Sequence, residues 1–144
     1  MKRVLLVDDE PAVLMALQRV LRGALGPDVA LDALSDPLLA LAQARRCRYD
    51  VVVSDLRMPD LDGVGLLTLM AAVQPQAVRV LLTGSSDFAT AQAAINEAGV
   101  FRYLCKPWNA QELRAHLQAA LAQAAAQAGE QARQEAASKK PVPA

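Results

Sequence analysis

The sequence predicts an α/β fold in which five parallel strands form one open sheet with helices on both faces. Two observations lead to this fold class. Short aliphatic runs alternate with longer segments of helical periodicity along the chain, which is typical of β-α units joined by right-handed crossovers. The 144 residues also suit one domain with a buried core, but not two.

Runs rich in aliphatic and β-branched residues predict the strands, because such side chains fit a pleated, buried surface. The first and third runs are uninterrupted aliphatics. The second run alternates, with Val29, Leu31 and Ala33 on one face and Asp32 on the other. The predicted strands cover residues 4–7, 29–34, 51–53, 78–82 and 100–104.

Helices are predicted where apolar residues recur every three or four positions. Pro11 opens the first helix at a first-turn position that tolerates proline, and Asp36 caps the second. Leucines at a spacing of four mark the start of the final helix. The predicted helices cover residues 11–25, 37–47, 64–73 and 88–98, and the final one starts at Asn109 or Ala110.

The composition of the strands predicts their order in the sheet. Uninterrupted aliphatic runs suit central strands, which are buried on both faces. The second and fifth strands contain Asp32 and Arg102, and these charged residues suit the two edges. The order 2-1-3-4-5 of a flavodoxin-like (βα)5 fold satisfies both conditions.

Composition and charge argue against several other classes of protein. A hydrophobic content of 53% excludes a disordered chain, and a formal net charge of zero offers no basic surface for direct nucleic-acid binding. Cys47 and Cys105 fit neither a metal-binding spacing nor a disulfide framework. No apolar run approaches the roughly 18 residues that span a bilayer, and no leader pattern follows Met1. A cytoplasmic protein without membrane contact is expected.

Polar side chains follow four of the predicted strands at their C-terminal ends, where ligands bind in such folds. Asp8 and Asp9 follow the first strand, Asp55 the third, Thr83 the fourth and Lys106 the fifth. Converging carboxylates repel one another, and a hard cation such as Mg²⁺ relieves the repulsion. A lysine and a hydroxyl beside that cation complete a site for a phosphoryl group.

Four blocks of this sequence resemble the signature blocks of response-regulator receiver domains of bacterial two-component systems. They read VLLVDDEP, VVVSDLRMPDLDG, VLLTG and FRYLCKPW, and they occur in the order and at the strand ends of that family. The resemblance covers residues 2 to about 121, and residues 1–121 are interpreted as the receiver domain. Residues 122–144 are interpreted as an alanine-rich helical extension that ends in a flexible tail.

The resemblance implies a phosphoacceptor and a metal site. Asp55 corresponds to the carboxylate that attacks phosphorus and becomes an acyl phosphate. Asp9 corresponds to a direct Mg²⁺ ligand and Asp8 to one that acts through a metal-bound water. Asp55 itself and the backbone carbonyl of Arg57 correspond to the remaining protein ligands.

The resemblance also implies a switch. Lys106 corresponds to the lysine that pairs with the phosphoryl oxygens, and the peptide bond before Pro107 is often cis in the family. Thr83 corresponds to the hydroxyl that moves toward the phosphoryl group. Tyr103 corresponds to the aromatic residue whose rotamer reports that movement. The implied partner surface combines the predicted helix over residues 88–98, the fifth strand and the last helix.

The implied function is a phosphorylation switch that receives its phosphoryl group from a sensor histidine kinase or a phosphotransfer protein. Such a receiver catalyses only its own phosphorylation and dephosphorylation, and its extended last helix further predicts a weak homodimer. The alternative is a phosphatase of the haloacid-dehalogenase type, which also forms an aspartyl phosphate with Mg²⁺. That class carries its nucleophile on the first strand in an Asp-x-Asp arrangement, whereas Asp8 and Asp9 are adjacent here.

Overall fold

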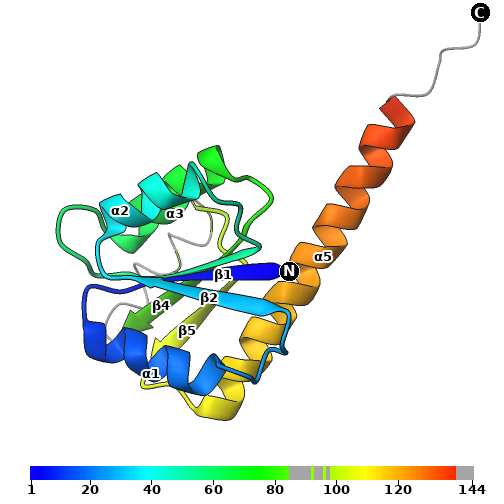
Figure 1. Cartoon of the computed structure of the whole chain (residues 1–144). Coiled ribbons are helices and arrows are strands. Elements are labelled where there is room, and N and C mark those ends of the chain that lie inside the picture. The colour runs from blue at the N-terminus through cyan, green and yellow to red at the C-terminus, as the bar shows by residue number, and fades with distance from the viewer. Residues whose placement is uncertain (85–91, 93–95, 97, 139–144) are drawn as a thin grey trace, which may run out of the picture.

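The computed structural model describes residues 1–84, 92, 96 and 98–138, and these contain one five-stranded parallel sheet (Figure 1). The strands lie side by side in the order β2-β1-β3-β4-β5, so the predicted order is confirmed. Their bounds are β1 (Lys2–Val7), β2 (Val29–Leu34), β3 (Val51–Asp55), β4 (Val78–Gly84) and β5 (Arg102–Lys106).

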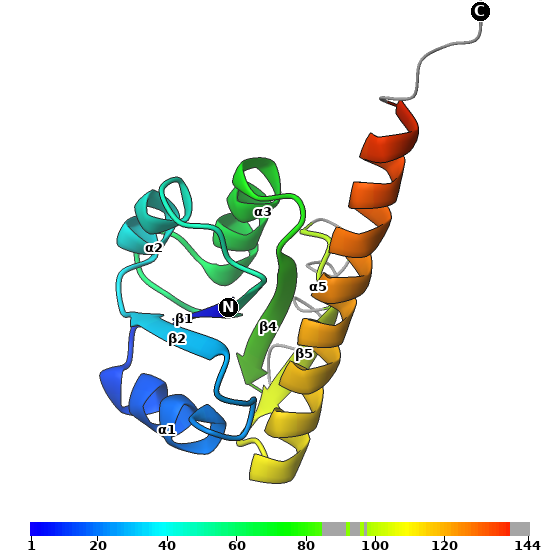
Figure 2. The ribbon, with the colours of Figure 1, turned by 45° about the vertical axis from the view of Figure 1, so that its right-hand side comes forward.

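Helices cover both faces of this sheet (Figures 1 and 2). Helices α1 (Pro11–Leu21) and α5 (Ala110–Ser138) pack on one face, whereas α2 (Pro37–Ala44) and α3 (Gly63–Val73) pack on the other. Successive side chains of a strand point to opposite faces, and they therefore divide between two apolar cores. In β1, for example, Leu6 belongs to the α1–α5 core and Leu5 to the α2–α3 core.

The burial of the strands follows their positions in the sheet. The last four residues of β1 are fully buried, and every residue of β3 is buried. Both strands pair on two sides and are covered on two faces, as their aliphatic composition predicts. The charged residues Asp32 and Arg102 lie on the edge strands β2 and β5, which confirms their predicted places.

Two predicted helix ends are wrong. The first helix ends at Leu21 instead of residue 25, because Gly23 and Gly26 adopt φ angles of 79° and 103° that a right-handed helix excludes. The second helix ends at Ala44 instead of residue 47. There the amide of Gln74, which follows α3, donates hydrogen bonds to the carbonyl oxygens of Ala44 and Cys47 and holds the turn.

Strand boundaries also differ from the predictions. Three strands extend beyond their aliphatic runs, because polar residues at their ends still take part in the ladder: β1 starts at Lys2, β3 reaches Asp55 and β4 reaches Gly84. The fifth strand is shifted at both ends: its ladder with β4 starts at Arg102 instead of residue 100 and ends at Lys106 instead of residue 104. The helix predicted over residues 88–98 and the loose end predicted over residues 138–144 lie almost entirely outside the described residues.

Helix α5 is longer than the face it covers. Its first half contributes the buried Leu113, Leu117 and Leu121 to the α1–α5 core, and Ala124 is the last residue of that core. The helix continues to Ser138, as the alanine-rich composition predicts, and residues 129–137 are exposed. Figure 2 shows this second half projecting past the sheet. Among the described helices, none combines the length and the apolarity needed to cross a bilayer.

Gly63 brings the start of α3 against the end of β3. Its amide donates a hydrogen bond of 2.8 Å to the backbone carbonyl of Leu56. A Cβ atom at this position would lie 2.2 Å from the backbone oxygen of Asp55. Only glycine permits so close an approach of the two backbones, so the position of Asp55 depends on this residue.

We therefore expect Gly63→Ala to lower the free energy of unfolding by about 1–3 kcal/mol, because the backbone of β3 or α3 must shift. Urea denaturation followed by circular dichroism measures this change. The matched control is Gly129→Ala in the exposed part of α5, where no atom lies within 4 Å of the added methyl group. In that variant the helical form should be favoured by about 1 kcal/mol, because alanine has a higher helix propensity than glycine. Equal stability of the Gly63 variant and the parent would contradict the close packing.

Candidate functional site

The ends of β1, β3 and β5 bring two carboxylates and one ammonium group together. Asp8 follows β1, while Asp55 and Lys106 are the last residues of β3 and β5. The alternation of each strand directs all three side chains toward the face of the α1–α5 core. The Nζ atom of Lys106 lies 3.1 Å from Oδ2 of Asp8 and 3.0 Å from Oδ1 of Asp55.

These charges are withdrawn from water. The exposed fraction is 0% for Asp8 and 6% for Asp55, and it is 25% for the Lys106 side chain. A buried carboxylate is costly unless it is paired and hydrogen-bonded. Lys106 provides one positive charge for two carboxylates, and the backbone amide of Glu10 donates a further hydrogen bond of 2.9 Å to Oδ1 of Asp8.

Burial dominates the protonation of both acids. Desolvation raises the pKa of Asp8 and that of Asp55, and the hydrogen bonds and charge of Lys106 counteract it only in part. The charge of Asp55 raises the pKa of Asp8 further, and the charge of Asp9 raises that of Asp55. For Lys106, burial lowers the pKa but the two carboxylates outweigh it, so that the pKa is raised.

A third carboxylate completes a set of possible metal ligands. Carboxylate oxygens of Asp8, Asp9 and Asp55 all lie within 4.8 Å of one another. With one lysine beside them, three ionised carboxylates leave a formal excess of two negative charges. Hard oxygen donors in such a cluster match the preference of Mg²⁺, so the residues present fit this cation.

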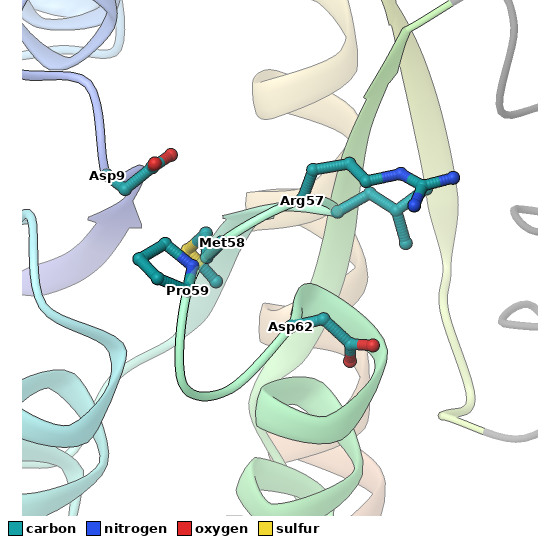
Figure 3. A pocket seen from close by; sticks show the side chains of 6 residues that line it. Asp9, Arg57, Met58, Pro59 and Asp62 are labelled. Atoms are coloured by element: carbon teal, nitrogen blue, oxygen red, sulfur yellow. The ribbon is translucent and has the colours of Figure 1, made fainter.

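A cavity of about 480 Å³ opens beside the carboxylates, between the end of β1 and the loop after β3. In Figure 3 the carboxylate of Asp9 points into this space, while the side chain of Arg57 extends away from Asp9. Arg57 thus lines the cavity with a side chain that is directed away from the Asp9 carboxylate. The lining residues are Asp9, Leu56, Arg57, Met58, Pro59 and Asp62.

Thr83 is close to this cluster in the sheet but faces the other way. Val80 and Leu82 of β4 belong to the α1–α5 core. Thr83 directly follows Leu82 in the strand, so its side chain points to the opposite face. The Thr83 hydroxyl donates a hydrogen bond to Sγ of Cys105 at 3.9 Å. Tyr103 points to the same face and packs, half-buried, against the α2–α3 core.

The structure thus brings four of the seven residues singled out from the sequence, Asp8, Asp9, Asp55 and Lys106, into one cluster. Arg57 lines the cavity beside Asp9, and Thr83 and Tyr103 lie on the other face of the sheet. The peptide bond between Lys106 and Pro107 is cis, in agreement with the resemblance. Cys105 was missed as a neighbour of Thr83. The parallel register pairs these two residues, and aligning the ends of the two predicted strands could have found it.

Comparison with known proteins agrees with this geometry. Residues 4–118 match the family model described as the response regulator receiver domain. The transcriptional regulatory protein ZraR of Salmonella typhimurium is 36% identical over 117 residues, which are 81% of this chain and 26% of that protein. The chain spans between 21% and 48% of the lengths of the first curated relatives that it matches.

Two solved structures place the fold in the same group. One is the signal receiver domain of an HD domain-containing protein from Pseudomonas fluorescens Pf-5, with a TM-score of 0.80, 35% identity and coverage of 92% of this chain and 93% of that one. The other is the receiver domain of the sensor histidine kinase PA1611 from Pseudomonas aeruginosa PAO1, which holds a magnesium ion in its active site cleft. Its TM-score is 0.73 at 27% identity, with 84% of this chain and 98% of that chain covered. From the family match and the shared fold, this chain belongs to the response regulator receiver domains of two-component systems.

Proposed function

We propose that this receiver domain is a phosphoacceptor switch in which Asp55 takes a phosphoryl group from a sensor histidine kinase or a phosphotransfer protein. The observation that carries the proposal is the placement of the buried Asp55 carboxylate within 3.0 Å of Lys106 and beside Asp8 and Asp9. A receiver domain of a sensor histidine kinase is among its structural neighbours, which supports a place in phosphotransfer.

The proposed transfer is an in-line displacement at phosphorus. A carboxylate oxygen of Asp55 forms the new bond to phosphorus, and the bond from phosphorus to the donor nitrogen or oxygen breaks, with its electron pair leaving on the donor. Lys106 favours the ionised, nucleophilic form of Asp55 and neutralises charge on the phosphoryl oxygens. Water completes the cycle by hydrolysing the acyl phosphate, so the domain catalyses only its own modification.

Asp8, Asp9, Asp55 and the backbone carbonyl of Arg57 are the groups that we propose hold Mg²⁺. Support comes from the clustered carboxylate oxygens of this chain and from the magnesium ion in the cleft of the PA1611 receiver. Bound there, the cation supplies positive charge that draws the phosphoryl oxygens toward Asp55.

The receiver function is favoured over the phosphatase alternative by the family match and by the location of the candidate nucleophile. The buried acid beside Lys106 is Asp55 at the end of β3, whereas the phosphatase class needs an Asp-x-Asp nucleophile on the first strand. An assay with a generic phosphate monoester distinguishes the two functions. A phosphatase turns over many times, and a receiver does not.

The output is proposed to pass through the face formed by the predicted helix over residues 88–98, β5 and α5. Movement of Thr83 toward the phosphoryl oxygens, reported by Tyr103, would bias this face toward a second arrangement. ZraR is a transcriptional regulatory protein, and modules of that kind are suitable readers of the switch. The receiver itself is proposed to make no direct contact with nucleic acid.

Acetyl phosphate with Mg²⁺ should add one phosphoryl group to this protein, visible by intact-mass spectrometry and removed by hydroxylamine. Asp55→Asn should abolish the addition, because an amide is not nucleophilic enough to attack phosphorus. Asp60→Asn is the matched control: Asp60 is exposed, and asparagine tolerates its φ of 68°. Labelling of the Asp55 variant at the parental level would remove Asp55 from its proposed role.

Replacing Asp9 by alanine should weaken Mg²⁺ binding by about tenfold or more without lowering the stability of the metal-free protein. The charge of Asp9 raises the pKa of the Asp55 carboxyl, so its removal relieves repulsion in the folded state. Isothermal titration with Mg²⁺ and thermal melting in EDTA measure the two effects. A clearly lower melting temperature in EDTA would instead make Asp9 a structural residue.

The same charges set a pH dependence in EDTA. Since the pKa values of Asp8 and Asp55 are raised in the folded protein, folding favours their protonated forms. Their contribution to stability is therefore largest below the ordinary aspartate pKa and declines as the pH rises through the raised values. Melting temperatures across this range should fall less in Asp9→Ala than in the parent. If the melting temperatures of the parent and of Asp9→Ala fell equally with pH, the proposed coupling between the Asp9 charge and the Asp55 carboxyl would be contradicted.

The exposed second half of α5 is the proposed site of weak homodimer formation. A helix gains stability from packing an apolar face, and residues 129–137 lie beyond the core of this domain. Sedimentation velocity should show a dimer that tightens with beryllofluoride, and removal of residues 125–144, which spares the buried Ala124, should loosen it. A monomer under every condition would exclude a dimer formed through α5.

A further inference from the structure

Two neighbouring residues at the end of β5 point to opposite faces of the sheet. Lys106 reaches the carboxylates on the α1–α5 side, whereas Cys105 lies opposite Thr83 in the register between β4 and β5. The Sγ atom of Cys105 is 3.9 Å from the Thr83 hydroxyl oxygen and accepts its hydrogen bond. Cys105 therefore contacts the proposed switch residue on the side of the sheet away from Asp55.

Thr83 is placed so that this contact matters. Its exposed fraction is only 1%, so water cannot readily replace a hydrogen-bond partner of its hydroxyl. A thiol sulfur is a weak acceptor, and at 3.9 Å it holds the hydroxyl without trapping it. An oxygen acceptor at hydrogen-bonding distance would restrain the hydroxyl more strongly.

We propose that Cys105 is a positioning residue that holds the Thr83 hydroxyl in its resting orientation and so sets how readily the domain converts to its phosphorylated form. The inference rests on the proposed function, in which Thr83 leaves this position to bond a phosphoryl oxygen. That movement breaks the hydrogen bond to the thiol. The free energy of this hydrogen bond therefore reduces the net stabilisation that Thr83 gains by bonding the phosphoryl oxygen. Cys105 thereby tunes the resting state without contacting the phosphoryl group.

Cys105 is suited to a test by substitution because it is exposed on the edge strand. Valine is close to cysteine in size, favours strands and has no acceptor atom. Cys105→Val should therefore fold like the parent and lose only the contact with the threonine. The other free cysteine, Cys47, packs against the α2–α3 core, and Cys47→Val is the matched control.

The experiment titrates the full chain with beryllofluoride in the presence of Mg²⁺ and counts bound fluoride by fluorine NMR. Cys105→Val should reach half-saturation at about a threefold lower concentration than the parent, because a weak hydrogen bond of the resting form is gone. Cys47→Val should match the parent. In the Thr83→Ala background, Cys105→Val should have no effect, since the hydroxyl is already absent.

An unchanged half-saturation in Cys105→Val, or the same shift with and without the Thr83 hydroxyl, would overturn the positioning role. The second result would mean that the residue acts through packing of the strand. Failure of the proposed function gives a different result, because the parent itself would then neither bind beryllofluoride nor take up a phosphoryl group on Asp55. The parent titration and the labelling of Asp55 thus distinguish the two failures.

Discussion

The site depends on the sharing of one ammonium group between two buried carboxylates. Asp8 and Asp55 are withdrawn from water, and Lys106 approaches both to about hydrogen-bond distance, at 3.1 and 3.0 Å. Removing two like charges from water is unfavourable unless a counter-charge lies between them. The sheet order puts the ends of β1 and β3 side by side, and the long side chain of Lys106 reaches both carboxylates from β5, on the far side of β4. The excess negative charge that remains explains why the same cluster suits a cation.

The alternation of strand side chains separates the chemistry from the proposed switch. Asp8, Asp55 and Lys106 share the face of the α1–α5 core, whereas Thr83 and Cys105 face the α2–α3 side. A slip of one residue in the register of a strand would move its side chains to the opposite face of the sheet. The aliphatic cores that fix the register therefore also fix which face each of these polar side chains occupies. A threonine turned away from the carboxylates does not compete with the acids for Lys106.

Sequence reasoning succeeds where a signal is local and fails where it depends on distant contacts. The aliphatic runs and the charges of Asp32 and Arg102 are enough to predict the strand order, and the strand ends are enough to find the acids and Lys106. The early end of α2 escapes prediction because it depends on hydrogen bonds from Gln74, about thirty residues away along the chain. The contact between Thr83 and Cys105 escapes it because the register of β5 against β4 is a property of the assembled sheet.

The edge position of β5 makes its end easier to displace than the ends of the central strands. Among the described strands, β5 pairs with β4 alone, so displacing its end breaks fewer hydrogen bonds than displacing β1 or β3 would. Lys106 connects that end to the carboxylates, and helix α5 starts at Ala110, only four residues further along the chain. Because α5 runs from the sheet to beyond the core, a small rotation at its start becomes a larger displacement at residues 129–137. In the proposed switch, the strand that carries the counter-charge is therefore also the strand that would transmit the movement to α5.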